Sequence, residues 1–310
     1  MLTRRNVFLI AALVTIFLLV AWASKAVTTV VPQVTVLLPS ATPSPSFSPE
    51  ASPPLPPAPT LPATLDLPVR LNMKSYGKHS PEYDARILNI HPEYVIDNPP
   101  HGLWGEISGY DTDELLQNVA VYQAAGIKVI GYLTGGYEGT GSAGDVDPQW
   151  YSLEMNKKLI TNMARLDHVD GIFVDECSKF PDESAKSYLR ELTTHAKSYG
   201  LITWGNVGED SFDPWFFTEG GFDFMHSTED WHGQDLSPVQ KEWGHCISVT
   251  GFNPDYTVQD ALDLTIDAWN KGIAFCYINN AEYSTIAPWF EEYATLLKSY
   301  GKLIPARPQP

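Results

Sequence analysis

The sequence predicts a (β/α)8 barrel, the TIM-barrel fold, over residues 69–310, and three observations support this fold class. Apolar runs typical of strands alternate with helical segments, and eight of each can be counted. The runs are typical of parallel strands that helices cover on both faces. Glycines suited to a helix C-cap come just before the next strand, at Gly126, Gly200, Gly244 and Gly272. An open doubly wound sheet is the alternative, but no glycine-rich dinucleotide loop supports it.

The eight predicted strands follow the apolar runs in chain order. β-Branched and aromatic residues, which favour strands, are frequent in these runs. The strands cover residues 69–74, 93–97, 127–133, 171–175, 201–206, 222–227, 246–250 and 273–278.

The predicted helices fill the intervals between these strands. Ser80-Pro81 and Asp147-Pro148 each have the form of an N-cap followed by a first-turn proline. Farther along, Ala185, Leu189 and Leu192 recur at helical spacing, and the segment from Val258 to Trp269 is amphipathic. The helices cover residues 80–90, 112–126, 147–166, 182–199, 213–219, 237–244, 258–269 and 288–300.

Two segments precede the predicted barrel. Residues 1–31 contain Arg4 and Arg5 followed by an apolar run from Val7 to Ala23, which predicts a signal peptide or an N-terminal membrane anchor. Residues 32–68 are rich in proline, serine and threonine and almost uncharged, which predicts a disordered linker or stalk. We therefore expect an extracellular or cell-surface protein that is secreted or tethered to the membrane through its N-terminal segment.

The composition limits the partners. The 310-residue chain has a formal net charge of −17 and a pI near 4.7, which argues against nucleic acid as a partner. The acidity also fits a protein that is simply soluble and exported. Three cysteines make no disulfide framework, and Cys246 with Cys276 is the pair to test. The sequence predicts no cofactor and does not determine an oligomeric state.

The stretch DGIFVDECSKF places two acids directly after an apolar strand. The active site of a TIM barrel lies at the carboxyl ends of its strands, where Asp175 and Glu176 follow the fourth strand and Glu229 follows the sixth. Carboxylates held close together divide their proton affinities, as glycoside hydrolysis requires. These three residues are the predicted catalytic groups. The alternative is that the pair caps the next helix or binds Lys179.

Other residues near the strand ends are predicted to bind substrate. Aromatic rings here can stack on sugar rings, although packing is the alternative role for each, and amides can bind hydroxyls. The predicted substrate-binding residues are Trp104, Tyr132, Tyr137, Asn206, Trp231, Asn279 and Tyr283. The cluster of His226, Glu229, Asp230 and His232 matches no established metal-ligand spacing, so we predict no metal site.

Four segments resemble the spherulation-specific (spherulin-4) family: VIGYLTGGY at 129–137, DGIFVDE at 170–176, FDFMHSTED at 222–230 and CYINNAEYSTIAPWFEE at 276–292. The resemblance implies a (β/α)8 glycoside hydrolase. The family includes endo-acting enzymes on α-1,4-linked galactosamine or N-acetylgalactosamine polymers. Its three functional acids correspond to Asp175, Glu176 and Glu229. The loop DNPPHGLWGE departs from the family's Asn-Pro-x-x-Gly-Pro-Gly, and the segment between the third and fourth strands is longer, so the sugar stays open.

The sequence therefore predicts an exported endo-glycosidase that hydrolyses an α-linked (N-acetyl)galactosamine-type polysaccharide. It does not assign the nucleophile or the proton donor, nor does it predict retention or inversion. The alternatives are a non-catalytic carbohydrate-binding or surface-adhesion domain on a stalk, and a metal-dependent hydrolase.

Overall fold

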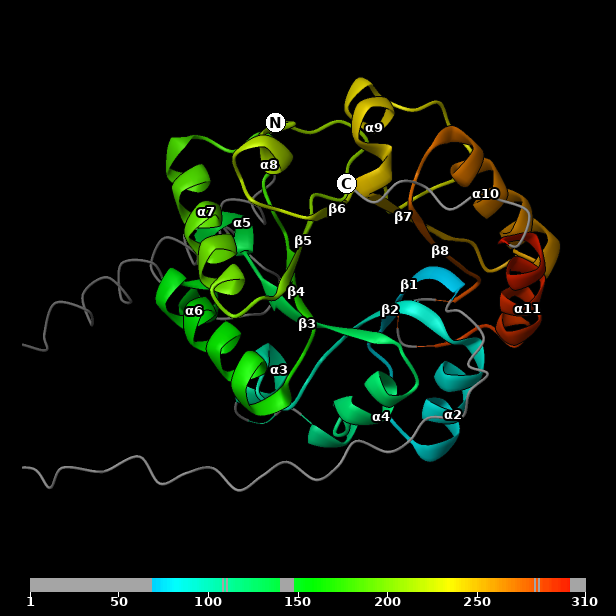
Figure 1. The fold of residues 1–310 in the computed structure, drawn as a ribbon, viewed down its shortest axis with the longest axis horizontal. Helices are drawn as coiled ribbons and strands as arrows, with labels where there is room; N and C mark the ends of the chain where they lie inside the picture. The colour runs from blue at the N-terminus through cyan, green and yellow to red at the C-terminus, as the bar shows by residue number, and fades with distance from the viewer. Residues whose placement is uncertain are drawn as a thin grey trace, which may run out of the picture. The chain divides into compact units, whose positions relative to one another are not determined.

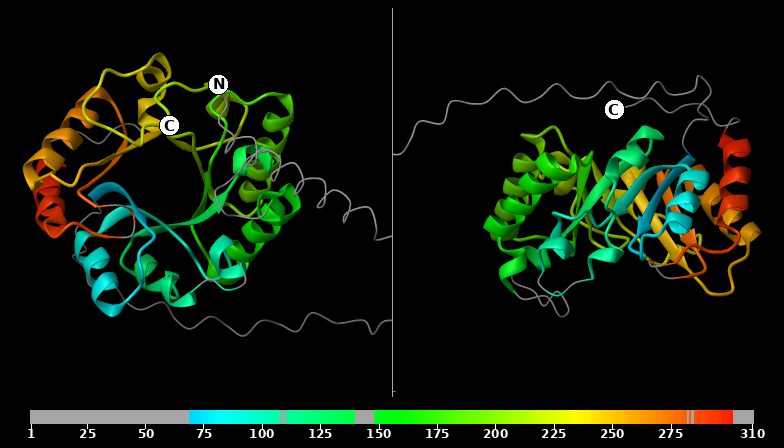
Figure 2. Two further views of the ribbon diagram at one scale, coloured as in Figure 1. Left: turned by 180° about the vertical axis from the view of Figure 1, so that it is seen from behind. Right: turned by 90° about the horizontal axis from the view of Figure 1, so that it is seen from below.

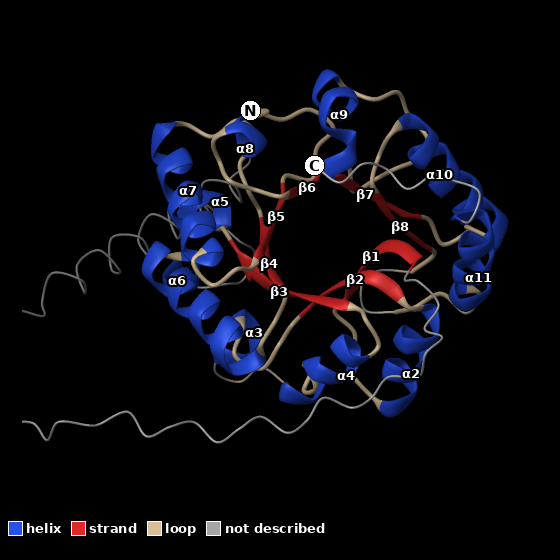
Figure 3. Cartoon of the chain, in the orientation of Figure 1, coloured by secondary structure: helices blue, strands red, loops and turns tan. Residues whose placement is uncertain are grey.

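The computed structural model describes residues 69–301, apart from 108, 110, 140–147, 282 and 284. The strands in this part of the chain form one closed parallel barrel in sequential order, so the predicted fold is confirmed (Figures 1 and 3). They are β1 (Val69–Ser75), β2 (Pro92–Asp97), β3 (Lys128–Thr134), β4 (Gly171–Asp175), β5 (Ile202–Asn206), β6 (Phe224–His226), β7 (Ile247–Phe252) and β8 (Phe275–Asn279).

Helices surround the ring of strands, as the views from behind and from the side also show (Figure 2). They are α2 (Pro81–Ile90), α3 (Leu103–Glu106), α4 (Val119–Ala124), α5 (Gly136–Gly139), α6 (Leu153–Asn162), α7 (Glu183–Lys197), α8 (Trp215–Thr218), α9 (Pro238–Trp243), α10 (Val258–Lys271) and α11 (Phe290–Gly301). Side-chain caps start several of them: Ser80 accepts from Tyr83 N, and Asp182 accepts from Ala185 N.

The hydrophobic core has two layers because alternate strand residues point to opposite faces. The larger layer lies between the strands and the helices. The smaller one fills the inside of the barrel with Tyr94, Ile96, Ile130, Phe173, Trp204, Ala274 and Phe275. Aromatic rings pack there at close range, with Trp204 and Phe224 4.7 Å apart. This packing closes the barrel below the strand ends and leaves the carboxyl-terminal mouth for polar groups.

Two predicted helices are shorter than the sequence pattern indicated. Residues 112–126 contain a 3-10 turn (Thr112–Glu114) and then α4, because the buried Leu116 donates its N–H to Asn98 O and cannot join a helix. In the described part of 147–166, a 3-10 turn precedes α6, which begins after Ser152, whose side chain accepts from Met155 N. Tertiary hydrogen bonds and a stronger cap outweigh the periodic pattern here.

Three of the four predicted glycine caps are confirmed. Gly126, Gly200 and Gly272 have positive φ angles, which glycine adopts without strain. Gly244 differs: its φ of −48° is right-handed, and it begins a 3-10 turn. A Cβ there would lie 2.7 Å from Gly272 O, so a close backbone approach explains this glycine.

Cys246 and Cys276, the cysteine pair singled out for testing, are not bonded to each other. Cys177, Cys246 and Cys276 are buried free thiols, and Cys276 faces Val249 across the sheet rather than Cys246. The predicted signal or anchor segment 1–31 and the linker 32–68 lie outside the described residues. Within the described residues, no helix combines the length and apolarity that a membrane crossing requires.

Candidate active site

Asp175 lies at the centre of the barrel mouth. It ends β4, and three donors hold its carboxylate: Tyr132 OH at 2.8 Å on Oδ2, with Asn206 Nδ2 at 2.6 Å and the N–H of Glu176 at 2.9 Å on Oδ1. The donors come from β3, β5 and the turn after β4. Three hydrogen bonds from three parts of the barrel fix the orientation of the carboxylate.

Glu229 follows β6 and faces Lys74 of β1. Lys74 Nζ lies 3.3 Å from Glu229 Oε1, and the lysine side chain is 2% exposed whereas that of the glutamate is 44% exposed. Burial favours a higher pKa for Glu229, but the charge of Lys74 and the hydrogen bonds from Asn206 and Lys74 outweigh it and lower the pKa. Glu229 is therefore a carboxylate in the free protein near neutral pH.

Asn206 links the two carboxylates. Its Nδ2 donates to Asp175 Oδ1 at 2.6 Å and to Glu229 Oε1 at 2.9 Å. Because both bonds share one nitrogen, the sum of their lengths limits the separation of the two oxygens to about 5.5 Å. Carboxyl groups of retaining glycosidases lie about 5–5.5 Å apart, and those of inverting enzymes about 6.5–9.5 Å.

Glu176 is the third carboxyl group of the mouth. Burial raises its pKa, the hydrogen bond from Thr134 Oγ1 (2.6 Å) counteracts this, and the charge of Asp175 adds to the rise. Its backbone is left-handed, with φ +57°, an uncommon conformation for a non-glycine residue. The pKa of Glu176 is raised and that of Glu229 is lowered, so Glu176 keeps its proton to a higher pH than Glu229 does.

The turn after β3 fixes that backbone. Gly135 N donates to Asp175 O at 2.7 Å, and Tyr137 N donates to Glu176 O at 2.8 Å. Glu138, which is also left-handed, accepts hydrogen bonds from the N–H and the hydroxyl of Ser178. The two loops are thus joined by main-chain and side-chain bonds, which hold the uncommon backbone at the site.

Tyrosine rings surround the carboxylates. Tyr76 lies 5.4 Å from Tyr132 and 5.6 Å from Tyr283 between ring centroids, and Tyr283 OH lies 3.3 Å from Lys74 Nζ. Tyr137, in the turn labelled α5, is 45% exposed and open to a ligand. Tyr132 instead binds Asp175 and stacks on Phe173, so it orients the carboxylate.

The structure thus brings seven of the sequence-predicted site residues to one mouth: Asp175, Glu176, Glu229, Asn206, Tyr132, Tyr137 and Tyr283.

Two predicted substrate-binding residues, Trp231 and Asn279, are buried in the core, and a third, Trp104, is partly buried. Trp231 is fully buried, and its Nε1 donates to Leu264 O, so no ligand reaches the ring. Asn279 is also fully buried. Its side chain donates to Thr285 O and accepts from the N–H of Ala287, and these bonds hold the loop after β8. Trp104 lies on the short helix α3, packed partly against the outer core.

Lys74, Tyr76 and Thr134 belong to the site, and the sequence analysis did not predict them. Lys74 lies within the first predicted strand, so a search of the residues after each strand passes over it. Thr134 follows the third predicted strand, but only the neighbouring tyrosines were predicted to bind substrate there. The sequence signal that could have indicated Lys74 is a lysine near the carboxyl end of a predicted barrel strand. Whether it faces inward depends on the barrel closing.

A second buried charge cluster lies beside the mouth. His79 Nδ1 is 2.6 Å from Asp84 Oδ1, and its Nε2 is 3.0 Å from Asp97 Oδ2 at the end of β2. Burial acts to lower the pKa of His79, but its bonds to the two aspartates dominate and raise it to about 9. The imidazolium therefore connects α2 and the loop before it to the end of β2.

The four residues considered as metal ligands in the sequence have other partners in the structure. His226 is fully buried inside the barrel, with hydroxyls of Ser248 and Thr250 at its two ring nitrogens. His232 Nδ1 lies 2.9 Å from Asp230 O. No group of three histidine, cysteine, aspartate or glutamate side chains within the described ranges is placed to hold a metal ion.

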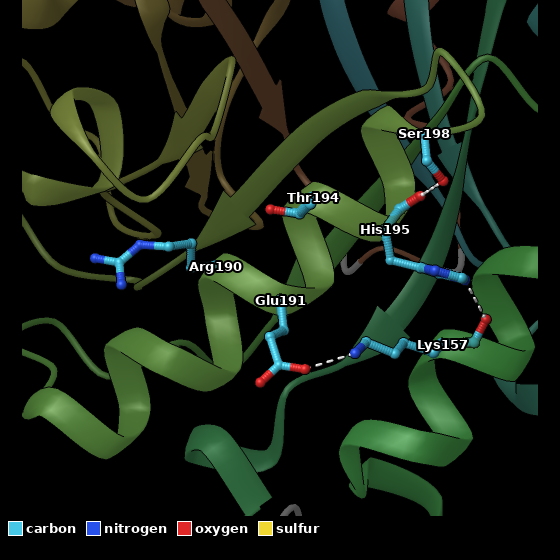
Figure 4. Close-up of a pocket in the computed structure, with 6 residues that line it drawn as sticks. All are labelled: Lys157, Arg190, Glu191, Thr194, His195 and Ser198. Carbon is cyan, nitrogen blue, oxygen red and sulfur yellow. Dashed lines mark hydrogen bonds and ion pairs between the residues drawn. The ribbon is translucent and has the colours of Figure 1, made fainter.

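A surface groove lies on the outer helices rather than at the mouth (Figure 4). Its side chains satisfy one another: Lys157 Nζ lies 2.6 Å from Glu191 Oε2, and His195 Nε2 lies 3.0 Å from Lys157 O. It contains one carboxylate and thus lacks an acid pair. The lining residues are Lys157, Arg190, Glu191, Thr194, His195 and Ser198.

No family model and no curated protein matches the chain. Among solved structures, Sph3 of Aspergillus clavatus in complex with GalNAc is similar, with 16% identity, a TM-score of 0.54, and coverage of 74% of this chain and 98% of Sph3. A chitinase of Rhizomucor miehei has 11% identity and a TM-score of 0.47 over 75% of this chain and 99% of the chitinase. At this identity the likeness to Sph3 shows the TIM-barrel fold.

Proposed function

We propose that this protein is a glycoside hydrolase that uses Asp175, Glu176 and Glu229. The observation that carries the proposal is the shared amide of Asn206, which holds two carboxylate oxygens within about 5.5 Å of each other. This upper limit is below the separation of about 6.5–9.5 Å in inverting enzymes, so the pair suits two groups acting on one glycosidic bond with retention of the anomeric configuration.

Asp175 is the nucleophile in this proposal. Three donors fix the orientation of its carboxyl group in the mouth, so it is positioned for attack on the anomeric carbon. Glu229 is the acid and base, because it stands at the open rim. It gives a proton to the leaving oxygen in the first step and takes one from water in the second.

Glu176 and Tyr137 complete the substrate site in this proposal. Glu176 Oε2 accepts a hydrogen bond from Thr134 Oγ1, which orients the carboxyl group so that it can bind a sugar hydroxyl. The exposed ring of Tyr137 offers a flat face to a sugar unit. Both come from the two joined loops, so they are positioned together.

The proposed substrate is an α-linked (N-acetyl)galactosamine-type polysaccharide, cleaved within the chain. Support comes from the resemblance in four sequence segments and from Sph3, whose solved complex contains GalNAc. The proposed location is outside the cell, secreted or tethered through residues 1–31. Fractionation of cells that express the full chain tests this: recovery with the cytoplasm would contradict it.

The test of activity uses the full chain with α-1,4-linked galactosaminan, acetylated and deacetylated. We expect new reducing ends with the native protein and losses of at least 100-fold for Asp175→Asn and Glu229→Gln. Glu209→Gln is the matched control, because Glu209 is an exposed acid after β5 that pairs with Lys179. It should keep full activity.

Proton NMR of the first product distinguishes the stereochemistry. An α-anomer formed first supports the retaining pair, and a β-anomer would contradict the assignment of Asp175 and Glu229. Binding without any release of reducing ends would instead indicate a carbohydrate-binding domain.

A further inference from the structure

A buried lysine stands behind one of the proposed catalytic acids. Lys74 Nζ lies 3.3 Å from Glu229 Oε1 and 3.3 Å from Tyr283 OH, and 4.4 Å from the centre of the Tyr283 ring. Glu229 Oε1 faces inward to this lysine and to Asn206, whereas Oε2 has no hydrogen-bond partner among the described residues. One oxygen is anchored, and the other is left for a ligand.

We propose that Lys74 and Glu229 act as one acid that holds a single proton, with Lys74 storing the proton that Glu229 delivers to the leaving oxygen. This inference rests on the proposed function. Lys74 is in this sense a positioning residue, because it acts on the substrate through Glu229.

The need for a stored proton follows from the state of Glu229. The leaving oxygen needs a proton, yet Glu229 is ionised in the free protein because its pKa is lowered. Two strongly coupled groups titrate as a pair, and between the two macroscopic pKa values the pair holds one proton. Over that whole range the proton needed for the first step is present at the site.

Burial favours transfer of that proton. Burial lowers the pKa of Lys74, and the charges of Glu229 and Asp175 restore it only in part. A bound sugar that removes water from the mouth increases the cost of the two separate charges. The reactive state is then the uncharged one, in which Lys74 is a neutral amine and Glu229 is a carboxylic acid.

The proton path balances over the two steps. First, a Lys74 N–H bond breaks and the Glu229 carboxyl gains the proton. The carboxyl then turns and gives it to the glycosidic oxygen, while Asp175 bonds to the anomeric carbon and the bond from that carbon to the leaving oxygen breaks. In the second step water attacks the anomeric carbon, Asp175 leaves, and Glu229 takes the water proton and returns it to the amine.

The titratable groups around Lys74 and Glu229 do not take up or release the proton that this pair shares. Burial lowers the pKa of His226 and the charge of Lys74 lowers it further, so the imidazole is neutral. Burial raises the pKa values of Tyr132 and Tyr283, so both phenols stay protonated. Asp175 acts electrostatically on Lys74, and its carboxyl group is held by its own donors, Tyr132, Asn206 and the N–H of Glu176. Asn206 and Thr250 are uncharged.

The kinetic test compares Lys74→Arg, Lys74→Met and the native protein. Arginine keeps the charge but does not release a proton, so we expect kcat/KM at pH 7 to fall at least 100-fold. In Lys74→Met, activity should be confined to pH values below the pKa of Glu229 itself, whereas the native protein stays active at neutral pH. A Lys74→Arg variant within a few-fold of the native rate would overturn proton storage.

A titration without substrate separates this inference from the proposed function. Carbon-13 NMR follows the Glu229 carboxyl, assigned with Glu229→Gln. We expect the native midpoint below 4.5 with a second inflection when Lys74 loses its proton, and in Lys74→Met a single midpoint at higher pH. Lys128→Met, at the opposite end of the barrel, should match the native curve.

The outcomes are distinct. Equal Glu229 midpoints in the native protein and Lys74→Met would overturn the inference. A shifted midpoint without cleavage of any glycan would keep the coupled pair and contradict the hydrolase. Thermal unfolding checks that each variant is folded, and we expect this because replacing a buried charge by an apolar side chain is often tolerated.

Discussion

Arg86 connects the first and last helices of the barrel, and its replacement by alanine should destabilise the fold measurably. Its Nε and Nη2 bind the two oxygens of Glu291 at 2.5 and 2.7 Å. Nη1 and Nη2 also donate to Ile286 O at 3.0 Å and Ala287 O at 2.7 Å. Figure 1 shows α2 beside α11, where the ring of helices closes.

The expected loss follows from these contacts. The carboxylate pair is about one-third exposed on both sides, so it contributes about 1 kcal/mol at most. The two bonds to carbonyls of buried residues each contribute about 0.5–1.5 kcal/mol. Arg86→Ala should therefore cost about 1–4 kcal/mol in the free energy of unfolding, or roughly 2–16 °C in Tm for a domain of this size.

Thermal and urea unfolding of the full chain measure this loss. Arg190→Ala is the matched control, since Arg190 lies 3.6 Å from Glu219 in an exposed pair and should lose less than about 1 kcal/mol. Glu291→Gln keeps the carbonyl bonds and should lose about 1 kcal/mol. The reasoning is refuted if Arg86→Ala loses no more than Arg190→Ala, or if Glu291→Gln loses as much as Arg86→Ala.

Three further predictions concern the mouth and its surroundings. Asn206→Ala removes the donor shared by two carboxylates, so activity on galactosaminan should fall about 100-fold, with an NMR titration showing a higher Glu229 pKa. The folded-state pKa of His79 lies above its ordinary 6.5, so its contribution to stability, about 3 kcal/mol at most, is complete below pH 6.5 and disappears as the pH rises through about 9. Urea unfolding should show this loss in the native protein, and a flat profile in His79→Gln. Trp231→Phe should lower Tm and leave KM unchanged, because the ring is core; a raised KM at equal stability would contradict its burial.

The fold was predictable because local signals and tertiary structure agree in most units. The predicted strand 171–175 and the observed β4 coincide, since an apolar run with β-branched residues lies between Asp170 and an acidic turn. The helix predicted over 112–126 failed where Leu116 bonds to Asn98. Such a bond depends on the closed barrel and leaves no periodic signal in the sequence.

The site was predictable in part for a similar reason. Asp175 and Glu176 stand out because acids are unusual directly after a buried strand. Trp231 and Asn279 also follow strands, yet both side chains turn into the core, and position after a strand does not fix that direction. Lys74 was missed because a lysine in a strand usually faces solvent, and only the closed barrel makes its face an interior.

The arrangement of the mouth explains how three acids can share it. Two unit charges 5.5 Å apart repel by about 3 kcal/mol at an effective dielectric constant of 20, so neighbouring carboxylates need different compensation. Asp175 has the donors of Tyr132 and Asn206, Glu229 has the cation of Lys74, and Glu176 has the hydroxyl of Thr134. Unequal partners give unequal proton affinities, with the pKa of Glu229 lowered and that of Glu176 raised. A barrel mouth that served only to bind a neutral sugar would not need this asymmetry, and acid–base chemistry does.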